Sequence, residues 1–191
     1  TQSGLFTEAD CEHLPEPVQR YFRTCGFLGK PKMSNMKAEF KHVAFKQGKT
    51  SQALTIDYTQ YNFVGEPGRI ALIRSSMHGI PFDGYDSFIG GSGSMKGVVG
   101  KLVTIFHQTG DAMNKAALAT FLAESLLVPN AALQDYILWE AIDDTHARAV
   151  IACRGISAEG IFTFGKAGEM LSFTTDDRAV YHNDGTIEQV G

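Results

Sequence analysis

The sequence lacks the long apolar run that a membrane-spanning helix requires. Its least polar stretch, residues 116–128, is interrupted by Glu124 and ends at Pro129, well short of the ~20 residues that cross a bilayer. It also lacks a basic excess, since 17 Lys and Arg stand against 21 Asp and Glu, for a net charge of −4. Because a phosphate backbone is bound by a basic surface, nucleic acid is not expected as a partner.

Cysteine is scarce, and no metal-ligand spacing occurs. The three cysteines, Cys11, Cys25 and Cys153, are widely spaced and form no C-x-x-C pair. We expect buried or half-buried free thiols, with a Cys11–Cys25 disulfide as the alternative if the chain folds back near Pro15 and Pro17. None of the six histidines lies three or four residues from another, so neither a metal nor a cofactor is predicted.

Nucleotide and nucleophile motifs are missing as well. The glycine-rich segment 90–97 suggests a Walker loop, which requires a glycine, four residues, and then Gly-Lys-Ser/Thr. Around Gly100-Lys101 the pattern fails twice: Met95 stands where the first glycine is needed, and Leu102 stands where Ser or Thr is needed. The dinucleotide pattern fails at Lys96, where a third glycine is needed. No G-x-S-x-G elbow is present, so no motif supports a serine hydrolase.

What is present is a helix followed by strand patterns. Apolar residues recur at helical spacing near the N-terminus: Leu14, Val18, Tyr21, Phe22 and Cys25. Pro17 suits the first turn of this helix and Gly26 its end, while Thr7 is a candidate cap for a separate preceding turn. From residue 33 to 78 the alternation becomes period two, which predicts strands with a turn at residues 47–49.

The apolar parity of these strands shifts twice. Val43 lies on the opposite set to Phe40, and Tyr61 on the opposite set to Tyr58, which predicts two β-bulges that bend the sheet. Residues 80–110 are rich in glycine and predict two or three short, strongly curved strands.

One amphipathic helix interrupts the strands. Asn114 is its expected N-cap, residues 114–127 carry its pattern, and Pro129 ends it before a short turn at 129–133. Strands then follow at 137–142, 147–154, 156–164 and 169–174. The order predicts a mainly β, α+β fold in one domain, residues 1–191. It consists of a curved antiparallel sheet or incomplete β-barrel, with a short N-terminal helix and one amphipathic helix on the concave face.

A hydrophobic cavity between sheet and helix is the expected ligand site. Its predicted lining is the helical stripe Leu118, Phe121, Leu122 and Leu126, together with Glu124 and Trp139. Glu124 falls away from the stripe on a helical wheel, which predicts a solvent position; the alternative is a carboxyl facing the cavity with a raised pKa. Trp139 is interpreted as a core anchor, with a ligand platform as the alternative.

Several ordered motifs carry a family resemblance: residues 14–23 (L-P-E-P-V-Q-R-Y-F-R), 86–95, 121–129, 138–140 and 162–169. Together they resemble an uncharacterised, mainly bacterial family that opens with an L-P-x-P-V-x-R-Y motif and has no assigned activity. The resemblance implies further strands beyond residues 184–186 and supplies no catalytic residue. The element order also resembles the half-barrel of lipoprotein carriers and receptors, which encloses acyl chains.

Three functions follow as hypotheses. The first is a protein that binds a hydrophobic small molecule or lipid chain. The second is a small hydrolase or isomerase acting on an apolar substrate, with Glu124, Asp86 or His107 as acid or base. The third is a purely structural or interaction domain without a cavity. The chain begins at Thr1 without a leader, as a trimmed chain would. Membrane proximity through a segment outside this sequence, and a bacterial envelope or cytoplasmic location, both stay open.

Overall fold

A computed structural model describes residues 3–46, 53–77, 79–181 and 187–190. The predicted turn at 47–49 and residues 184–186 lie outside this part, as do His78 and His182. The helices are α1 (Glu8–Cys11), α2 (Glu16–Thr24), α3 (Asp111–Glu124), η1 (Ser125–Leu127) and η2 (Pro129–Leu133). The strands are β1 (Asn35–Phe45), β2 (Leu54–Phe63), β3 (Gly68–Met77), β4 (Ile80–Ile89), β5 (Ser92–Val99), β6 (Val103–Gln108), β7 (Ile137–Ala141), β8 (His146–Cys153), β9 (Ile156–Phe164), β10 (Met170–Thr174), β11 (Arg178–Tyr181) and β12 (Ile187–Val190).

The first six strands form one antiparallel meander, which we call the large sheet. Its register shifts between Phe40 and Val43 in β1, where the sequence predicts a bulge, and again at Gly97 in β5. The second predicted bulge, between Tyr58 and Tyr61, is wrong: β2 pairs continuously with β3. Tyr58 and Tyr61 therefore lie on opposite faces of the large sheet, and the change of parity reflects apolar residues on both faces.

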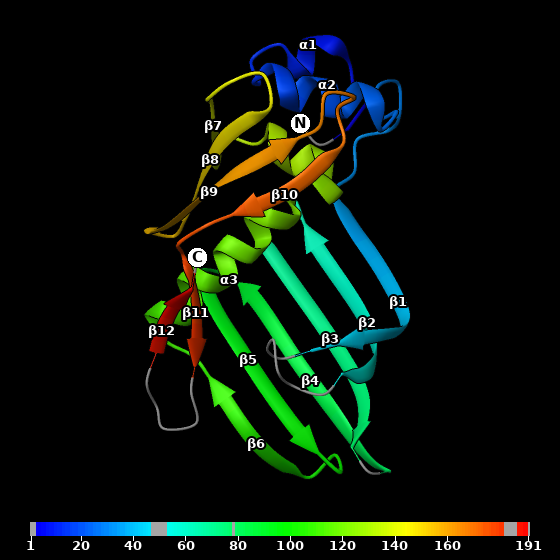
Figure 1. Ribbon diagram of the computed structural model, residues 1–191, viewed down its shortest axis with the longest axis vertical. Helices are drawn as coiled ribbons and strands as arrows, with labels where there is room; N and C mark the ends of the chain where they lie inside the picture. Colours follow the sequence, from blue (N-terminus) through cyan, green and yellow to red (C-terminus); the bar gives the residue numbers. More distant parts are fainter. Residues whose placement is uncertain (1–2, 47–52, 78, 182–186, 191) are drawn as a thin grey trace.

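A second antiparallel sheet, which we call the small sheet, has the order β10-β9-β8-β7, as the final meander predicts. Strands β11 and β12 form a separate hairpin. The large and small sheets do not close into a barrel, and α3 contacts β4 and β5 of one and β8 and β9 of the other. Figure 1 shows α3 across the upper part of the large sheet, while the lower ends of β3–β6 extend past it. The mainly β fold with one covering helix is thus confirmed.

The start of α3 differs from the prediction. Gly110, with φ 101°, is the N-cap, and the helix begins at Asp111 rather than at Asn114. The Asn114 side chain instead accepts a hydrogen bond of 2.8 Å from the backbone N–H of Gly93 on β5. A Cβ at Gly93 would collide with the carbonyl oxygen of Met113 and with the side chain of Ala117. The glycine therefore permits α3 to approach the large sheet closely.

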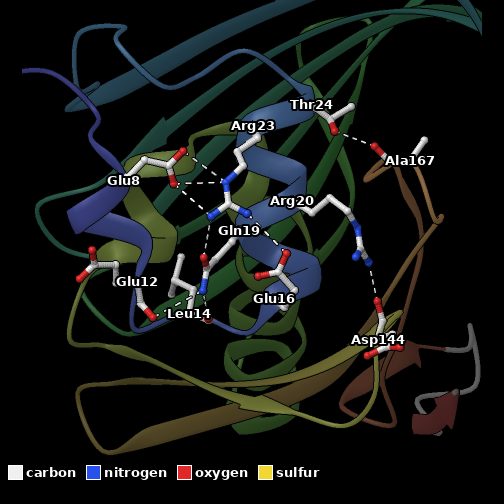
Figure 2. A network of polar contacts seen from close by, with 10 residues as sticks. All are labelled: Glu8, Glu12, Leu14, Glu16, Gln19, Arg20, Arg23, Thr24, Asp144 and Ala167. Atoms are coloured by element: carbon white, nitrogen blue, oxygen red, sulfur yellow. Dashed lines mark hydrogen bonds and ion pairs between the residues drawn. The ribbon is translucent and has the colours of Figure 1, made fainter.

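The N-terminal helices close the end of the small sheet. Thr7 caps α1 as expected, in a reciprocal pair of hydrogen bonds with Asp10. Arg20 donates to the backbone oxygen of Asp144, and Thr24 donates to that of Ala167 at 2.6 Å, so α2 is bound to two turns of the small sheet (Figure 2). The segment that carries the L-P-x-P-V-x-R-Y pattern thus has a structural role.

Figure 2 also shows Arg23 binding Glu8 of α1, Glu16 and Gln19, which fixes α2 against α1. The apolar side of α2 enters the main core, where Val18 and Phe22 are fully buried. All three cysteines are free, so the alternative of a Cys11–Cys25 disulfide is not realised.

Candidate functional site

A buried arginine organises a polar cluster between the large sheet and α3. The side chain of Arg69, on β3, is 5% exposed. Its Nε donates to Oε2 of Glu124 at 2.8 Å, its Nη1 to Oδ2 of Asp86 at 2.5 Å, and its Nη2 to the hydroxyl of Tyr58 at 2.5 Å. A single guanidinium therefore joins three strands and the last residue of α3.

Two amides complete this cluster. Nε2 of Gln60 and Nδ2 of Asn62 donate to the same Glu124 oxygen, at 2.6 and 3.1 Å. Both lie on β2, where side chains two residues apart point to one face, and Asn62 is paired with Arg69 across the sheet. We call Tyr58, Gln60, Asn62, Arg69, Asp86 and Glu124 the Arg69 cluster.

The charges of the Arg69 cluster do not cancel, because one guanidinium faces two carboxylates. Burial would by itself lower the pKa of Arg69, but Asp86 and Glu124 outweigh it and raise that pKa above its ordinary value. Burial raises the pKa of Tyr58 to about 12, so its hydroxyl keeps its proton at neutral pH. The side chains of Glu124 and Asp86 are 18% and 25% exposed, so each of them reaches the surface in part.

The position of Glu124 corrects the sequence analysis, which placed it in solvent. The wheel treats α3 as a helix with one buried side, whereas α3 lies between two sheets and is buried on both. The predicted alternative of Glu124 facing the interior is therefore the one realised. Its partners there are charged and amide side chains.

Of the other predicted ligand-binding residues, the helical stripe lies in the packed core, and the half-buried Trp139 packs against that core. The stripe residues are all 0–1% exposed: Leu118, Phe121, Leu122 and Leu126. Trp139 packs its ring against Phe162, with centroids 5.2 Å apart, and its Nε1 donates to the backbone oxygen of Ala132 at 3.0 Å. The structure brings Glu124 to Asp86, but not to His107, whose ring lies on the opposite face of the large sheet, 3.2 Å from the Ser94 hydroxyl.

Beyond the Arg69 cluster, the same face of the large sheet is apolar and uncovered. Several large side chains there are exposed: Phe40 (47%), Val43 (36%), Phe45 (37%), Ile80 (50%) and Val103 (61%). Half-buried neighbours share the face by strand register: Leu54, Ile73, Phe82, Val99 and Phe106. We call these ten residues the open apolar face. It adjoins the Arg69 cluster, since the rings of Phe40 and Tyr58 are 5.9 Å apart.

Comparison with known proteins identifies the family. A family of unknown function, DUF6544, matches residues 4–191. The chain belongs to the DUF6544 family. Neither a curated protein nor a solved structure matches it. This agrees with the expected uncharacterised family, whereas the likeness of this DUF6544 chain to lipoprotein carriers stays a prediction from architecture.

Two searches of the described residues of this DUF6544 chain bear on membranes and metals. In the described ranges, none of the helices has the length and apolar character required to cross a membrane. In those same ranges, no three or more His, Cys, Asp or Glu side chains gather as metal ligands.

Sequence reasoning missed Arg69 and the two amides of β2. A signal was available in the sequence, because Gln60 and Asn62 follow Tyr58 at a spacing of two and so lie on the same face of the strand. A strand face that only packs against a helix should be apolar, so two amides on that face indicate a polar cluster. Buried amides at such positions need partners, and Arg69 is the nearest basic residue along the next strand.

Proposed function

We propose that this protein binds a hydrophobic small molecule or lipid chain on the open apolar face, with the polar end of the ligand toward the Arg69 cluster. The observation that carries the proposal is the contrast between the two halves of one sheet face. Near Phe88, which is fully buried, α3 covers the large sheet. Farther along the strands, Ile80 and Val103 are 50% and 61% exposed. Contiguous exposed apolar surface of this kind is typical of a binding site.

Two bends in the outer strands favour a small ligand over a flat protein partner. The register shifts at Phe40/Val43 and at Gly97/Val98 lie in the two outermost strand pairs of the large sheet, β1–β2 and β5–β6. Because bulges bend strands and increase their twist, the outer strands turn relative to the centre of the large sheet. His42, at the first bulge, has φ 55°, a left-handed conformation that marks a sharp local bend.

The Arg69 cluster supports a ligand with a polar end. It lies where the covered part of the face meets the open part, and Tyr58 contributes to both. Its carboxylates are partly accessible, and the protonated Tyr58 hydroxyl is a hydrogen-bond donor. An apolar wall with a few fixed polar groups is the usual composition of a small-molecule site.

Displacement of an environment-sensitive fluorophore by lipids tests the proposal, together with native mass spectrometry of gently purified protein. We expect saturable displacement, and we expect Val103→Asp and Ile80→Asp to weaken it about tenfold, because a charge would enter the apolar contact. Leu138→Asp is the matched control: Leu138 is 69% exposed on β7, away from this face, and its variant should bind as the wild type does.

The outcomes separate the alternatives. If lipids do not displace the fluorophore, no lipid is bound, and the protein sediments as a monomer, the remaining hypothesis is a purely structural domain. Dimerisation that Val103→Asp abolishes would instead make the open apolar face an interface between copies. Equal lipid binding by Val103→Asp and Leu138→Asp would place the ligand elsewhere and contradict the proposal.

One observation favours a second function, acid–base catalysis on an apolar substrate: Glu124 and Asp86 meet at one guanidinium beside apolar surface. Both carboxylates are held by hydrogen bonds, as a positioned acid and base require. Hydrolysis of p-nitrophenyl acyl esters tests it. Turnover that is lost in Glu124→Gln and kept in Asp143→Asn, an exposed carboxylate in a turn, would support it; absence of turnover by the wild type counts against it.

A further inference from the structure

A hollow of about 810 Å³ lies on the opposite face of the large sheet from α3. Strand register places Arg74, Asp83 and Val98 in one row across this face, and Leu72, Tyr85 and Lys96 in the next. The turn between β5 and β6 adds Lys101 and Leu102 at its rim. The hollow is therefore separate from both the open apolar face and the Arg69 cluster.

Its lining is basic although the whole chain is acidic. Three cations, Arg74, Lys96 and Lys101, line it against one carboxylate, Asp83, in a chain of net charge −4. Arg74 also borders a smaller hollow that contains Glu39 and Asp57, so Lys96 and Lys101 carry most of the surplus. Within the part of the chain that the structure describes, none of the three cations forms an ion pair.

The backbone fixes Lys101 in an unfavourable conformation. Gly100 and Lys101 have φ of 61° and 63°, and the N–H of Leu102 bonds to the carbonyl of Val99 at 3.2 Å, which makes a β-turn with positive φ at both central residues. Glycine or asparagine suits the second position of such a turn, and lysine is uncommon there. Lys101 thus places a positive charge at the rim of the hollow.

We propose that this hollow binds an anionic small molecule that also carries an apolar group. The cations attract a phosphate or carboxylate, and Leu72, Tyr85 and Val98 offer apolar contact beside them. Leu102 is 89% exposed at the rim and extends this apolar contact outward. The same chemistry is found in a free phosphorylated metabolite and in the headgroup region of an anionic lipid.

An NMR titration with phenyl phosphate tests the proposal. We expect saturable shifts at the backbone amides of Tyr85 and Val98, which weaken as sodium chloride is added. Lys96→Gln and Lys101→Gln should each raise Kd about fivefold, the effect of removing one charge about 4 Å from an anion in water. Lys166→Gln, an exposed lysine in the β9–β10 turn, is the matched control and should leave Kd unchanged.

Further probes define the source of the anion. Phenyltrimethylammonium, a cation of similar shape, should produce no saturable shift. A lipid headgroup is indicated if the protein sediments with phosphatidylglycerol vesicles but not with phosphatidylcholine vesicles, and if Lys101→Gln reduces this sedimentation. A free metabolite is indicated if the protein binds phenyl phosphate but not vesicles. Both results support the proposal.

Two results would overturn it: shifts that map away from the hollow, and equal Kd values for the wild type, Lys96→Gln and Lys101→Gln. Thermal unfolding of each variant checks that it is folded, and we expect no change because these side chains are at least partly exposed. The proposal is independent of lipid binding on the open apolar face. Ile73 borders both surfaces, but the cations that carry this proposal lie on the opposite face of the large sheet.

Discussion

Arg69 and Glu124 form an ion pair of 2.8 Å that joins the third strand of the large sheet to the last residue of α3. Both ends are largely buried, with side chains 5% and 18% exposed. Such pairs contribute little net stability compared with an apolar contact, but removal of one partner is costly because the other charge stays buried. The pair therefore sets where α3 ends on the sheet more than it adds to stability.

Replacement of Arg69 by methionine should destabilise the protein by about 3 kcal/mol, since two partly buried carboxylates would lose their shared cation. Urea unfolding at neutral pH measures this change in the free energy of unfolding. Arg148→Met is the control: Arg148 also binds two carboxylates, Glu140 and Glu159, but is 40% exposed. It should cost much less than Arg69→Met, because solvent screens the exposed charges. Equal losses in the two variants would show that burial of Arg69 has no energetic consequence.

Much of the fold is predictable from local pattern. Period-two alternation and turn residues place the strands of both sheets, because each strand has a neighbour next to it in sequence. The start of α3 is not predictable in the same way. Asn114 has the side chain of an N-cap, but it is used three residues inside the helix to bind the N–H of Gly93, a contact that only the tertiary structure creates.

The site is less predictable than the fold. Glu124 is polar, so a wheel with one buried side assigns it to solvent; its partners Arg69 and Gln60 are 55 and 64 residues away in sequence. The excess of apolar residues on the strands is visible in the sequence, but which of them α3 covers depends on how the helix crosses the sheet. That crossing leaves Ile80 and Val103 exposed while Phe88 is buried.

Gly93→Ala should destabilise the protein by about 2 to 3 kcal/mol, because the added methyl group would overlap the carbonyl of Met113 and the side chain of Ala117. Thermal or urea unfolding measures the loss. The double variant Gly93→Ala, Ala117→Gly removes one of the two overlaps and should recover part of it. A single variant as stable as the wild type would contradict the close approach of α3 to β5.

Asp10 should make stability depend on pH in the acid range. The Lys32 ammonium at 2.5 Å, together with the Thr7 hydroxyl, lowers the pKa of Asp10 from 3.8 to about 2. A carboxyl whose folded pKa is depressed adds stability above its unfolded pKa and loses it as pH falls through the folded value. The Asp10 side chain is 23% exposed, which screens the effect, so we expect about 1 to 2 kcal/mol between pH ~5 and ~2.

Asp10→Asn isolates this contribution. The difference in free energy of unfolding between the wild type and Asp10→Asn should be largest near neutral pH and should shrink toward pH ~2. Asp176→Asn, at an exposed carboxylate in the turn after β10, serves as the control for removal of one surface charge. If the difference for Asp10→Asn does not change with pH, the lowered pKa of Asp10 is contradicted.

The three free thiols should react at very different rates. Cys25 is exposed, whereas Cys11 is 1% exposed and Cys153 is 7% exposed. Burial raises the pKa of Cys11 to about 11 and raises that of Cys153 as well, so neither thiol supplies appreciable thiolate at neutral pH. Ellman's reagent should therefore titrate one thiol quickly in the native protein and all three in denaturant. Fast native labelling in Cys25→Ser would contradict this.

Tyr21→Phe should cost about 1 to 2 kcal/mol, although it removes a single oxygen atom. The Tyr21 hydroxyl is buried between α2 and η1 and donates to the backbone oxygen of Leu126 at 3.0 Å. Burial raises the pKa of this phenol above its ordinary value, so its hydroxyl keeps its proton at neutral pH. Without it, the Leu126 carbonyl loses this partner in an apolar region.

Tyr85→Phe is the control for Tyr21→Phe. Its ring is 46% exposed, so the substitution should change the free energy of urea unfolding by less than about 0.5 kcal/mol. Equal costs would mean that water replaces the Tyr21 hydroxyl, and that α2 is held to η1 by apolar packing alone.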